Sequence, residues 1–136
     1  MLRILFVIIG ISILLNACSS ADLLTQLGGT EWNVTSLLGK ILNADEMSKG
    51  LPSLNFSDNG KLFGSTGCNN FTGSYKLDGA NLSLDPGAMT KMFCPGETEQ
   101  DFLKAISQVT NVKMDGSVLN LLNGEKTVMS LEPKSK

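Results

Sequence analysis

The stretch GSTGCNNFTGSY, residues 64–75, places one cysteine, Cys68, among glycines, asparagines and hydroxyl side chains, with aromatic residues close behind. It matches neither of the two common glycine-rich phosphate-binding patterns, and its flanking residues favour strands over the start of a helix. Glycine within a strand more often marks a bulge or a close approach of two backbones. The stretch therefore indicates closely packed strands. By itself it leaves three roles open for Cys68: a nucleophile, a metal ligand or one end of a crosslink.

Turn residues separate a series of short apolar runs on both sides of this stretch. Four turns contain residues that tolerate a positive φ angle, as tight hairpins require: Asp58-Asn59-Gly60, Asp78-Gly79, Asp115-Gly116 and Asn123-Gly124. The runs between them resemble strands: 31–38, 53–57, 61–65, 71–77, 81–84, 88–93, 111–115, 118–122 and 127–132. Hairpins repeated at about ten-residue spacing favour an antiparallel barrel or sandwich. We therefore expect a mainly β fold of the α+β kind, a small antiparallel barrel-like sheet of short hairpins.

One segment, at about residues 97–110, has the pattern of an amphipathic helix instead. Four apolar residues recur at helical spacing and give it one apolar face: Phe102, Leu103, Ile106 and Val109. Thr98 and Asp101 resemble a capping box, and Glu97, Glu99 and Asp101 lie near the positive end of the helix dipole. These acids fit helix initiation and a solvated face better than a catalytic or metal cluster. We expect the helix to pack on the sheet through Phe102 and Ile106.

The N-terminal residues MLRILFVIIGISILLNACSS have the pattern of a signal peptide. Arg3 supplies a positive charge, and the uncharged run 4–15 is too short to span a bilayer of roughly 30 Å. Residues 15–18 (LNAC) resemble the lipobox of bacterial lipoproteins, which implies cleavage after residue 17 and acylation of Cys18. The alternatives are an uncleaved anchor helix, or an ordinary signal peptide whose cysteine is incidental.

These boundaries define the expected domain organisation. Residues 1–17 form the signal peptide, 18–26 the lipidated N-terminus and tether, 27–132 one domain, and 133–136 a tail. Removing the first 17 of the 136 residues leaves 119, a length that suits one core and not two. Arg3 is the only arginine, so the mature chain carries 10 Lys against 13 Asp and Glu. Because nucleic-acid binding needs clustered positive charge, we expect no nucleic-acid partner.

With Cys18 assigned to lipid, Cys68 and Cys94 remain as a pair in an exported protein, where disulfides persist. Their crosslink would stabilise the domain by about 3.5 kcal/mol in the chain-entropy treatment. The alternative is two separate buried thiols. The sequence contains no histidine, so a cysteine nucleophile lacks its usual base and a zinc site lacks further ligands. We therefore predict a Cys68–Cys94 disulfide, no metal and no cofactor.

Several motifs, taken in order along the chain, resemble the META/HslJ domain family (heat shock protein HslJ-like). They are residues 28–32 (GGTEW), 52–56 (PSLNF), 67–75 (GCNNFTGSY), 88–94 (AMTKMFC), Glu99 with Phe102-Leu103, and 116–121 (GSVLNL). The resemblance covers about residues 27–131. It implies a small, mostly antiparallel, barrel-like domain with a helix packed on it, often secreted or lipid-anchored. Some members are associated with heat shock and antibiotic tolerance, and the family supplies no catalytic residues.

Our leading functional hypothesis is a non-enzymatic, lipid-anchored envelope protein that acts as an interaction or stress-tolerance module. Four motif residues form a candidate interaction patch, although they serve equally well to shape the fold: Asn69, Asn70, Phe71 and Tyr75. We expect a monomeric domain, a membrane contact through Cys18 and an envelope protein partner. The alternatives are a periplasmic barrel that binds a small apolar ligand, inside or at its mouth, and an enzyme of unknown type. Ser19 stands where enteric inner-membrane lipoproteins carry aspartate, which favours the outer membrane, facing the periplasm.

Intact mass spectrometry of the native protein tests the anchor and the crosslink together. Protein purified from membranes without reductant should begin at Cys18, carry acyl chains there and have two fewer protons than the dithiol form. Alkylating reagents should label Cys68 and Cys94 only after reduction. An unacylated chain, or one that is alkylated without reduction, would contradict the corresponding assignment.

Overall fold

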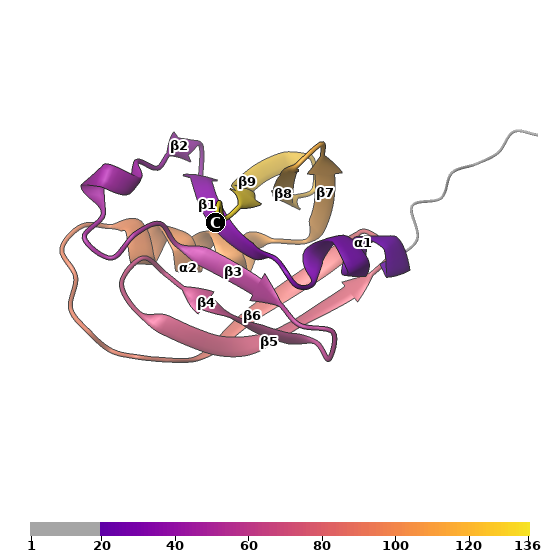
Figure 1. Cartoon of the computed structure of the whole chain (residues 1–136), viewed down its shortest axis with the longest axis horizontal. Coiled ribbons are helices and arrows are strands. Elements are labelled where there is room, and N and C mark those ends of the chain that lie inside the picture. The colour runs from indigo at the N-terminus through magenta and orange to yellow at the C-terminus, as the bar shows by residue number, and fades with distance from the viewer. Residues whose placement is uncertain (1–19) are drawn as a thin grey trace, which may run out of the picture.

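A computed structural model of the chain describes residues 20–136, so the expected signal peptide and the lipidated Cys18 lie outside the described residues. The fold is mainly β, as predicted, with one sheet, two α-helices and a short 3-10 helix, Ala44–Glu46 (Figure 1). The helices are α1 (Ser20–Leu27) and α2 (Thr98–Gln108). The strands are β1 (Glu31–Leu37), β2 (Lys40–Ile41), β3 (Ser53–Phe56), β4 (Lys61–Ser65), β5 (Asn70–Asp78), β6 (Asn81–Met89), β7 (Asn111–Asp115), β8 (Val118–Asn123) and β9 (Lys126–Pro133).

The sheet closes into a ring because β1 pairs with both β3 and β9. Every strand pairing is antiparallel, and β2 lies outside the ring as a short extension beside β1. The seam between β6 and β7 is the weakest, because its register contains one pair, Asn81 with Asn111. Helix α2 connects these two strands in the sequence and packs against β6. The barrel-like sheet predicted from the hairpin spacing is thus confirmed.

Glycines of the opening stretch allow the strands of the ring to approach closely, as predicted. A Cβ atom on Gly64 would lie 2.0 Å from the carbonyl oxygen of Ser53 on β3. A Cβ atom on Gly73 would lie 1.9 Å from the carbonyl oxygen of Asp85 on β6. No side chain fits at such distances, so both positions require glycine.

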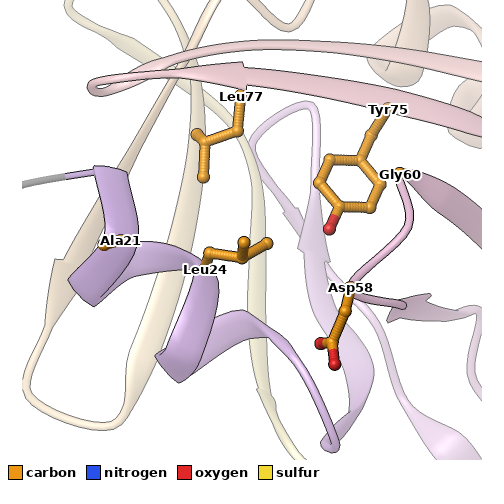
Figure 2. A pocket seen from close by; sticks show the side chains of 6 residues that line it. All are labelled: Ala21, Leu24, Asp58, Gly60, Tyr75 and Leu77. Carbon is orange, nitrogen blue, oxygen red and sulfur yellow. The ribbon is translucent and has the colours of Figure 1, made fainter.

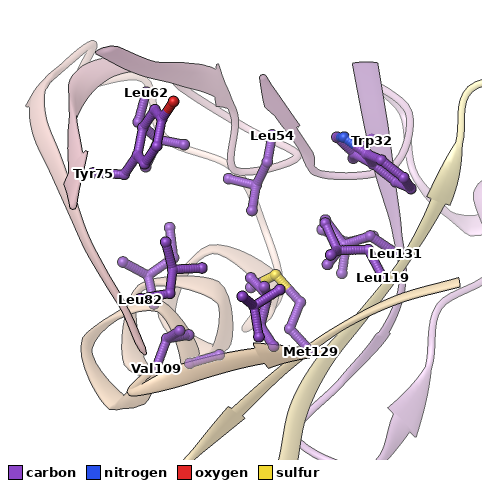
Figure 3. Close-up of a cluster of buried hydrophobic side chains, with 14 of the residues drawn as sticks. Trp32, Leu54, Leu62, Tyr75, Leu82, Val109, Leu119, Met129 and Leu131 are labelled. Atoms are coloured by element: carbon purple, nitrogen blue, oxygen red, sulfur yellow. The ribbon is translucent and has the colours of Figure 1, made fainter. Parts of the chain in front are cut away.

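Apolar side chains fill the inside of the ring. Residues from all parts of the chain converge there, among them Trp32, Leu62 and Leu131 (Figure 3). Tyr75 stacks edge-on against Phe56 at 5.1 Å between ring centroids, and its hydroxyl donates to the carbonyl oxygen of Ser57 at 2.6 Å. The interior is therefore a packed core of the kind found in small barrels.

Helix α2 confirms the predicted helix and its apolar face but corrects its start. Phe102 and Ile106 are buried, and the ring of Phe102 lies 5.6 Å from that of Phe71. The predicted capping box is wrong, because Thr98 is already helical and Glu97, at the cap position, makes no side-chain hydrogen bond to the helix. A Glu side chain is poorly suited to that role, for which Ser, Thr, Asp and Asn are preferred.

The expected tether is corrected by helix α1, which covers residues 20–27. Leu23 and Leu27, one helical turn apart, are buried in the core. The indole nitrogen of Trp32 donates to the carbonyl oxygen of Leu27 at 3.1 Å, which ties the end of α1 to β1. An eight-residue helix is marginal in isolation, so only this packing makes it stable. That is why the sequence pattern alone did not indicate it.

The run 88–93, predicted as a strand, is only partly so. Strand β6 ends at Met89, and residues 90–97 form the loop that leads to α2. Strand β2 was not predicted, because two residues are too few to show an alternation. Within residues 20–136, no helix has both the length and the apolar character needed to cross a membrane.

Replacement of Leu27 by Ala tests whether α1 belongs to the folded domain. We expect Leu27→Ala to lower the free energy of unfolding of the full-length protein by about 2–5 kcal/mol, because it leaves a cavity in the core. Urea denaturation measures the change. Gln26→Ala, at an exposed position of the same helix, is the matched control. Equal stability of the two variants would contradict the assignment of α1 to the core.

Candidate functional site

The candidate site is an exposed apolar tip on the loop between β6 and α2. Phe93 is 93% exposed and Met92 is 49% exposed, and we call these two residues the tip. Loop residues 90–97 lie at the end of the molecule opposite the start of α1 (Figure 1). Isolated apolar side chains are common on protein surfaces, whereas two adjacent ones form a contiguous patch, the kind of feature that marks a contact surface.

The buried side chain of Asn69 holds the backbone of the tip in place. Its Oδ1 accepts hydrogen bonds from the backbone N–H of Met92 at 2.7 Å and from the hydroxyl of Thr90 at 2.9 Å. Its Nδ2 donates to the carbonyl oxygen of Met92 at 3.0 Å. One amide side chain thus makes both hydrogen bonds that a neighbouring strand would make to Met92.

Thr66 and Glu99 complete this network and orient Asn69. The Asn69 amide also donates to Glu99, at 2.9 Å from Oε2. The Thr66 hydroxyl donates to the same oxygen at 2.5 Å and accepts from the backbone N–H of Asn69 at 2.9 Å. Among residues 20–136, every buried side-chain nitrogen and oxygen has a hydrogen-bond partner. The network is therefore complete, a condition under which buried polar groups specify one arrangement.

These contacts correct the expected role of Glu99, which does not belong to the solvated face of the helix. Partial burial raises the pKa of its carboxyl. Hydrogen bonds from Thr66 and Asn69, together with the charge of Lys91, lower the pKa by more than burial raises it. The net effect is a pKa below the usual value, so the carboxylate is ionised at neutral pH. Asp101 instead forms an ion pair with Lys40 at 3.1 Å.

The structure joins Cys68 and Cys94 in a disulfide, with their Cα atoms 5.9 Å apart. Cys94 follows the tip directly, and Cys68 precedes Asn69. The loop is therefore fixed to the β4–β5 connection both covalently and by hydrogen bonds. No group of three or more His, Cys, Asp or Glu residues within residues 20–136 is arranged to hold a metal ion.

A cavity of about 350 Å³ lies behind the disulfide. Its walls come from the 3-10 helix region and from the start of α2, and include both cysteines, Met47, Pro95, Glu46 and Glu99. On the tip side the charges are positive: the ammonium of Lys49 donates to the sulfur of Met92 at 3.4 Å, and Lys91 precedes it in the sequence. The tip is thus apolar with basic neighbours, and the cavity behind it is acidic.

Most of the predicted interaction patch is not on the surface. Asn69, Phe71 and Tyr75 are buried, and only Asn70 is exposed. The expectation that these four residues form a contact patch is corrected, because the first three serve the network and the core. The exposed residues are in the neighbouring motif, AMTKMFC, which sequence reasoning assigned to a strand. The adjacent Met and Phe, which break the strand alternation just before a cysteine, were the available signal.

A second surface pocket lies at the other end of the molecule, beside α1. It measures about 360 Å³ and is lined by Leu24, Leu77, Tyr75 and Asp58, with Ala21 and Gly60 (Figure 2). Burial raises the pKa of Tyr75, as does the charge of Asp58, so its hydroxyl stays a proton donor and is engaged by Ser57. The filled core leaves no room for the apolar ligand that we considered inside the barrel. The pocket beside α1 offers few free polar groups that could orient a ligand there.

Comparisons with known proteins identify the family and the fold. The META domain family matches residues 25–136. An NMR structure of a protein from Burkholderia xenovorans is 23% identical with a TM-score of 0.60, over 87% of this chain and 90% of that one. A crystal structure of a DUF4847 family protein from Bacteroides vulgatus is 18% identical with a TM-score of 0.59, over 81% and 96% of the two chains. A further NMR structure is 23% identical with a TM-score of 0.63, over 80% and 92%. None of the curated proteins compared with this chain matches it.

Replacement of Glu99 by Gln tests the polar network through its pH dependence. Because the folded-state pKa of Glu99 is lowered, its stabilising effect is complete above the ordinary value of 4.5 and is lost as the pH falls through the folded-state pKa. Glu99→Gln should remove this part of the acid dependence. It should also lower the free energy of unfolding at pH 7 by about 1–3 kcal/mol, since a buried donor then loses its acceptor.

Denaturant titrations between pH 3 and pH 7 make this measurement. Glu132→Gln, at an exposed position of β9, is the control and should keep the acid dependence of the wild type. A Glu99→Gln variant with an unchanged pH profile would show that ionisation of Glu99 contributes nothing to stability.

Proposed function

The chain belongs to the META domain family, and we propose that it is a non-enzymatic, lipid-anchored interaction module of the cell envelope that contacts a protein partner through its tip. The observation that carries this proposal is that Met92 and Phe93 are exposed while the backbone that bears them is fixed by a buried side chain. A fixed apolar contact loses little conformational entropy on binding, which favours affinity. Aromatic side chains are also frequent among the residues that dominate protein interfaces.

Lysines beside the tip suit a partner with an apolar pocket and carboxylates near its rim. Lys49 contacts Met92 directly, and Lys91 is its exposed neighbour. Charges at the rim of an interface guide the approach of a partner more than they set its affinity. The contact energy would therefore come mainly from burial of Phe93.

The proposed anchor supports the same assignment of the tip. Cys18 lies two residues before Ser20, where α1 begins, so acylation of Cys18 would place this end of the domain at the membrane surface. The loop with the tip is at the opposite end of the molecule (Figure 1). A domain held in this way presents Phe93 away from its own bilayer, toward soluble or opposing partners. We propose the outer membrane, facing the periplasm, as the site of the anchor.

The proposal of a role without catalysis rests on the sequence. No histidine is available as a base, and both cysteines of the domain are joined. The resemblance to HslJ-like proteins favours a role for the contact in tolerance of heat or antibiotics.

Replacement of Phe93 by Ser tests the tip as the contact surface. Affinity purification from crosslinked membranes of stressed cells, followed by quantitative mass spectrometry, should recover an envelope partner with the wild-type protein. We expect recovery of that partner to fall strongly with Phe93→Ser, because truncation of a central aromatic residue costs about 2 kcal/mol of binding energy, roughly thirtyfold in affinity. Stability should be unchanged, since Phe93 is almost fully exposed.

Ile41→Ser is the matched control, because Ile41 is 89% exposed but lies on β2. Its partner recovery should equal that of the wild type. Equal recovery with Phe93→Ser and wild type would exclude the tip, and an equal loss with both variants would show nonspecific apolar association.

A further inference from the structure

The Cys68–Cys94 disulfide is accessible to solvent through the acidic cavity. Both cysteines line this space, which at about 350 Å³ has room for a small thiol. The two sulfur atoms differ in their surroundings, because Cys68 is 7% exposed whereas Cys94 is more exposed, on the loop. A thiolate that enters the cavity therefore reaches Cys94 more easily than Cys68.

The surroundings of Cys68 suit a leaving group. The Nδ2 of Asn69, which also donates to Met92 and Glu99, lies 3.5 Å from the cysteine sulfur and can share a hydrogen bond with a thiolate formed there. The carbonyl oxygen of Met92, at 3.6 Å, can accept a hydrogen bond once that thiolate takes up a proton. Thiol–disulfide exchange proceeds fastest when the leaving sulfur is stabilised as an anion.

We propose that the Cys68–Cys94 bridge is a thiol-exchange site that is attacked at Cys94. The thiolate of an incoming thiol forms a new S–S bond to Cys94, the Cys94–Cys68 bond breaks, and its electron pair leaves on Cys68. Cys68 then takes a proton from solvent. The products are a mixed disulfide at Cys94 and a free thiol at Cys68, without net loss or gain of electrons.

The charges in the cavity select the class of thiol. Glu46 and Glu99 both line it, and the carboxylate of Glu99 is ionised at neutral pH because its pKa is lowered. The attacking species is a thiolate, so these two carboxylates, which outnumber the neighbouring Lys91, disfavour a thiolate with a second negative charge and favour one whose own ammonium group offsets the charge on sulfur. The site therefore accepts thiols such as cysteamine in preference to thiols that carry a sulfonate or carboxylate.

Exchange would also change the tip. Opening of the bridge removes the covalent tie directly after Phe93, and leaves the loop held by hydrogen bonds, chiefly those of Asn69. This consequence rests on the proposed function, because it matters only if the tip binds a partner. The exchange reaction itself does not depend on a partner.

Peptide mapping after exchange tests the position of attack. The full chain with Cys18→Ser, which leaves Cys68 and Cys94 as its two cysteines, is treated with cysteamine without denaturant and then alkylated. We expect at least about tenfold more cysteamine on Cys94 than on Cys68, with the alkyl group on Cys68. Cysteamine mainly on Cys68, or reaction only at denaturant concentrations that unfold the protein, would overturn the proposal.

A series of thiols tests the charge selection. Exchange rates are measured with cysteamine, mercaptoethanol and mercaptoethanesulfonate. Each rate constant is calculated per thiolate and divided by the rate constant of the same thiol with hydroxyethyl disulfide, a simple reference disulfide. The resulting relative rate is free of differences in intrinsic thiol reactivity. At low ionic strength we expect the relative rate of cysteamine to exceed that of mercaptoethanesulfonate by about threefold or more. In about 1 M salt, which screens the charges, this ratio of relative rates should be smaller. Glu46→Gln should reduce the ratio, and Glu132→Gln should not. Equal relative rates for all three thiols would overturn the assigned thiol class.

These experiments contain no partner protein, so their failure leaves the proposed contact of the tip standing. Conversely, if exchange occurs at Cys94 as expected but the Phe93→Ser variant recovers as much partner as the wild type, the proposed contact is excluded and the proposed exchange site is supported.

Discussion

The pairing of β1 with β9 turns a row of hairpins into a closed ring, and the core and the places of both helices follow from that closure. It aligns Leu37 with Met129 and Val34 with Leu131, residues nearly a hundred positions apart in the sequence. Once the ring is closed, inward-facing side chains have partners on the opposite side, and most strand edges are paired, the exceptions being the β6–β7 seam and β2. The helices then have defined places, α2 beside the weak seam and α1 against the core.

Closure also determines where polar groups can be buried. At the end of the ring that carries the β4–β5 connection, Asn69 points inward and is matched by Thr66, Glu99 and the backbone of Met92. A buried amide with all of its partners fixes a loop more firmly than apolar packing does, because any displacement leaves donors and acceptors unpaired. The tip is exposed for the same reason: the hydrogen bonds occupy the inner side of the loop, and Phe93 is left outside.

The proposed contact and the proposed exchange site share this loop. Met92 and Phe93 precede Cys94, so a reaction at the bridge changes the restraint on the residues that would bind. The loop thus has two restraints of different chemistry, the reducible disulfide and the hydrogen bonds of Asn69. The core is built from side chains of both helices and of the strands paired around the ring, and neither cysteine of the bridge belongs to it.

The fold class, the positions of most strands and the apolar face of α2 could be predicted from the residues alone, because these features follow from local alternation, turn residues and helical spacing. The sequence also indicated that Gly64 and Gly73 lie where backbones meet, and that Cys68 and Cys94 form a pair. The roles of Asn69, Phe71 and Tyr75 became clear only in the folded molecule, because a motif cannot assign a residue to surface or core. The same holds for Glu99, whose hydrogen-bond partners are about thirty residues away. Helix α1 and the exposed tip depend likewise on contacts between distant segments. Burial is a property of the closed ring, and no local pattern of residues contains it.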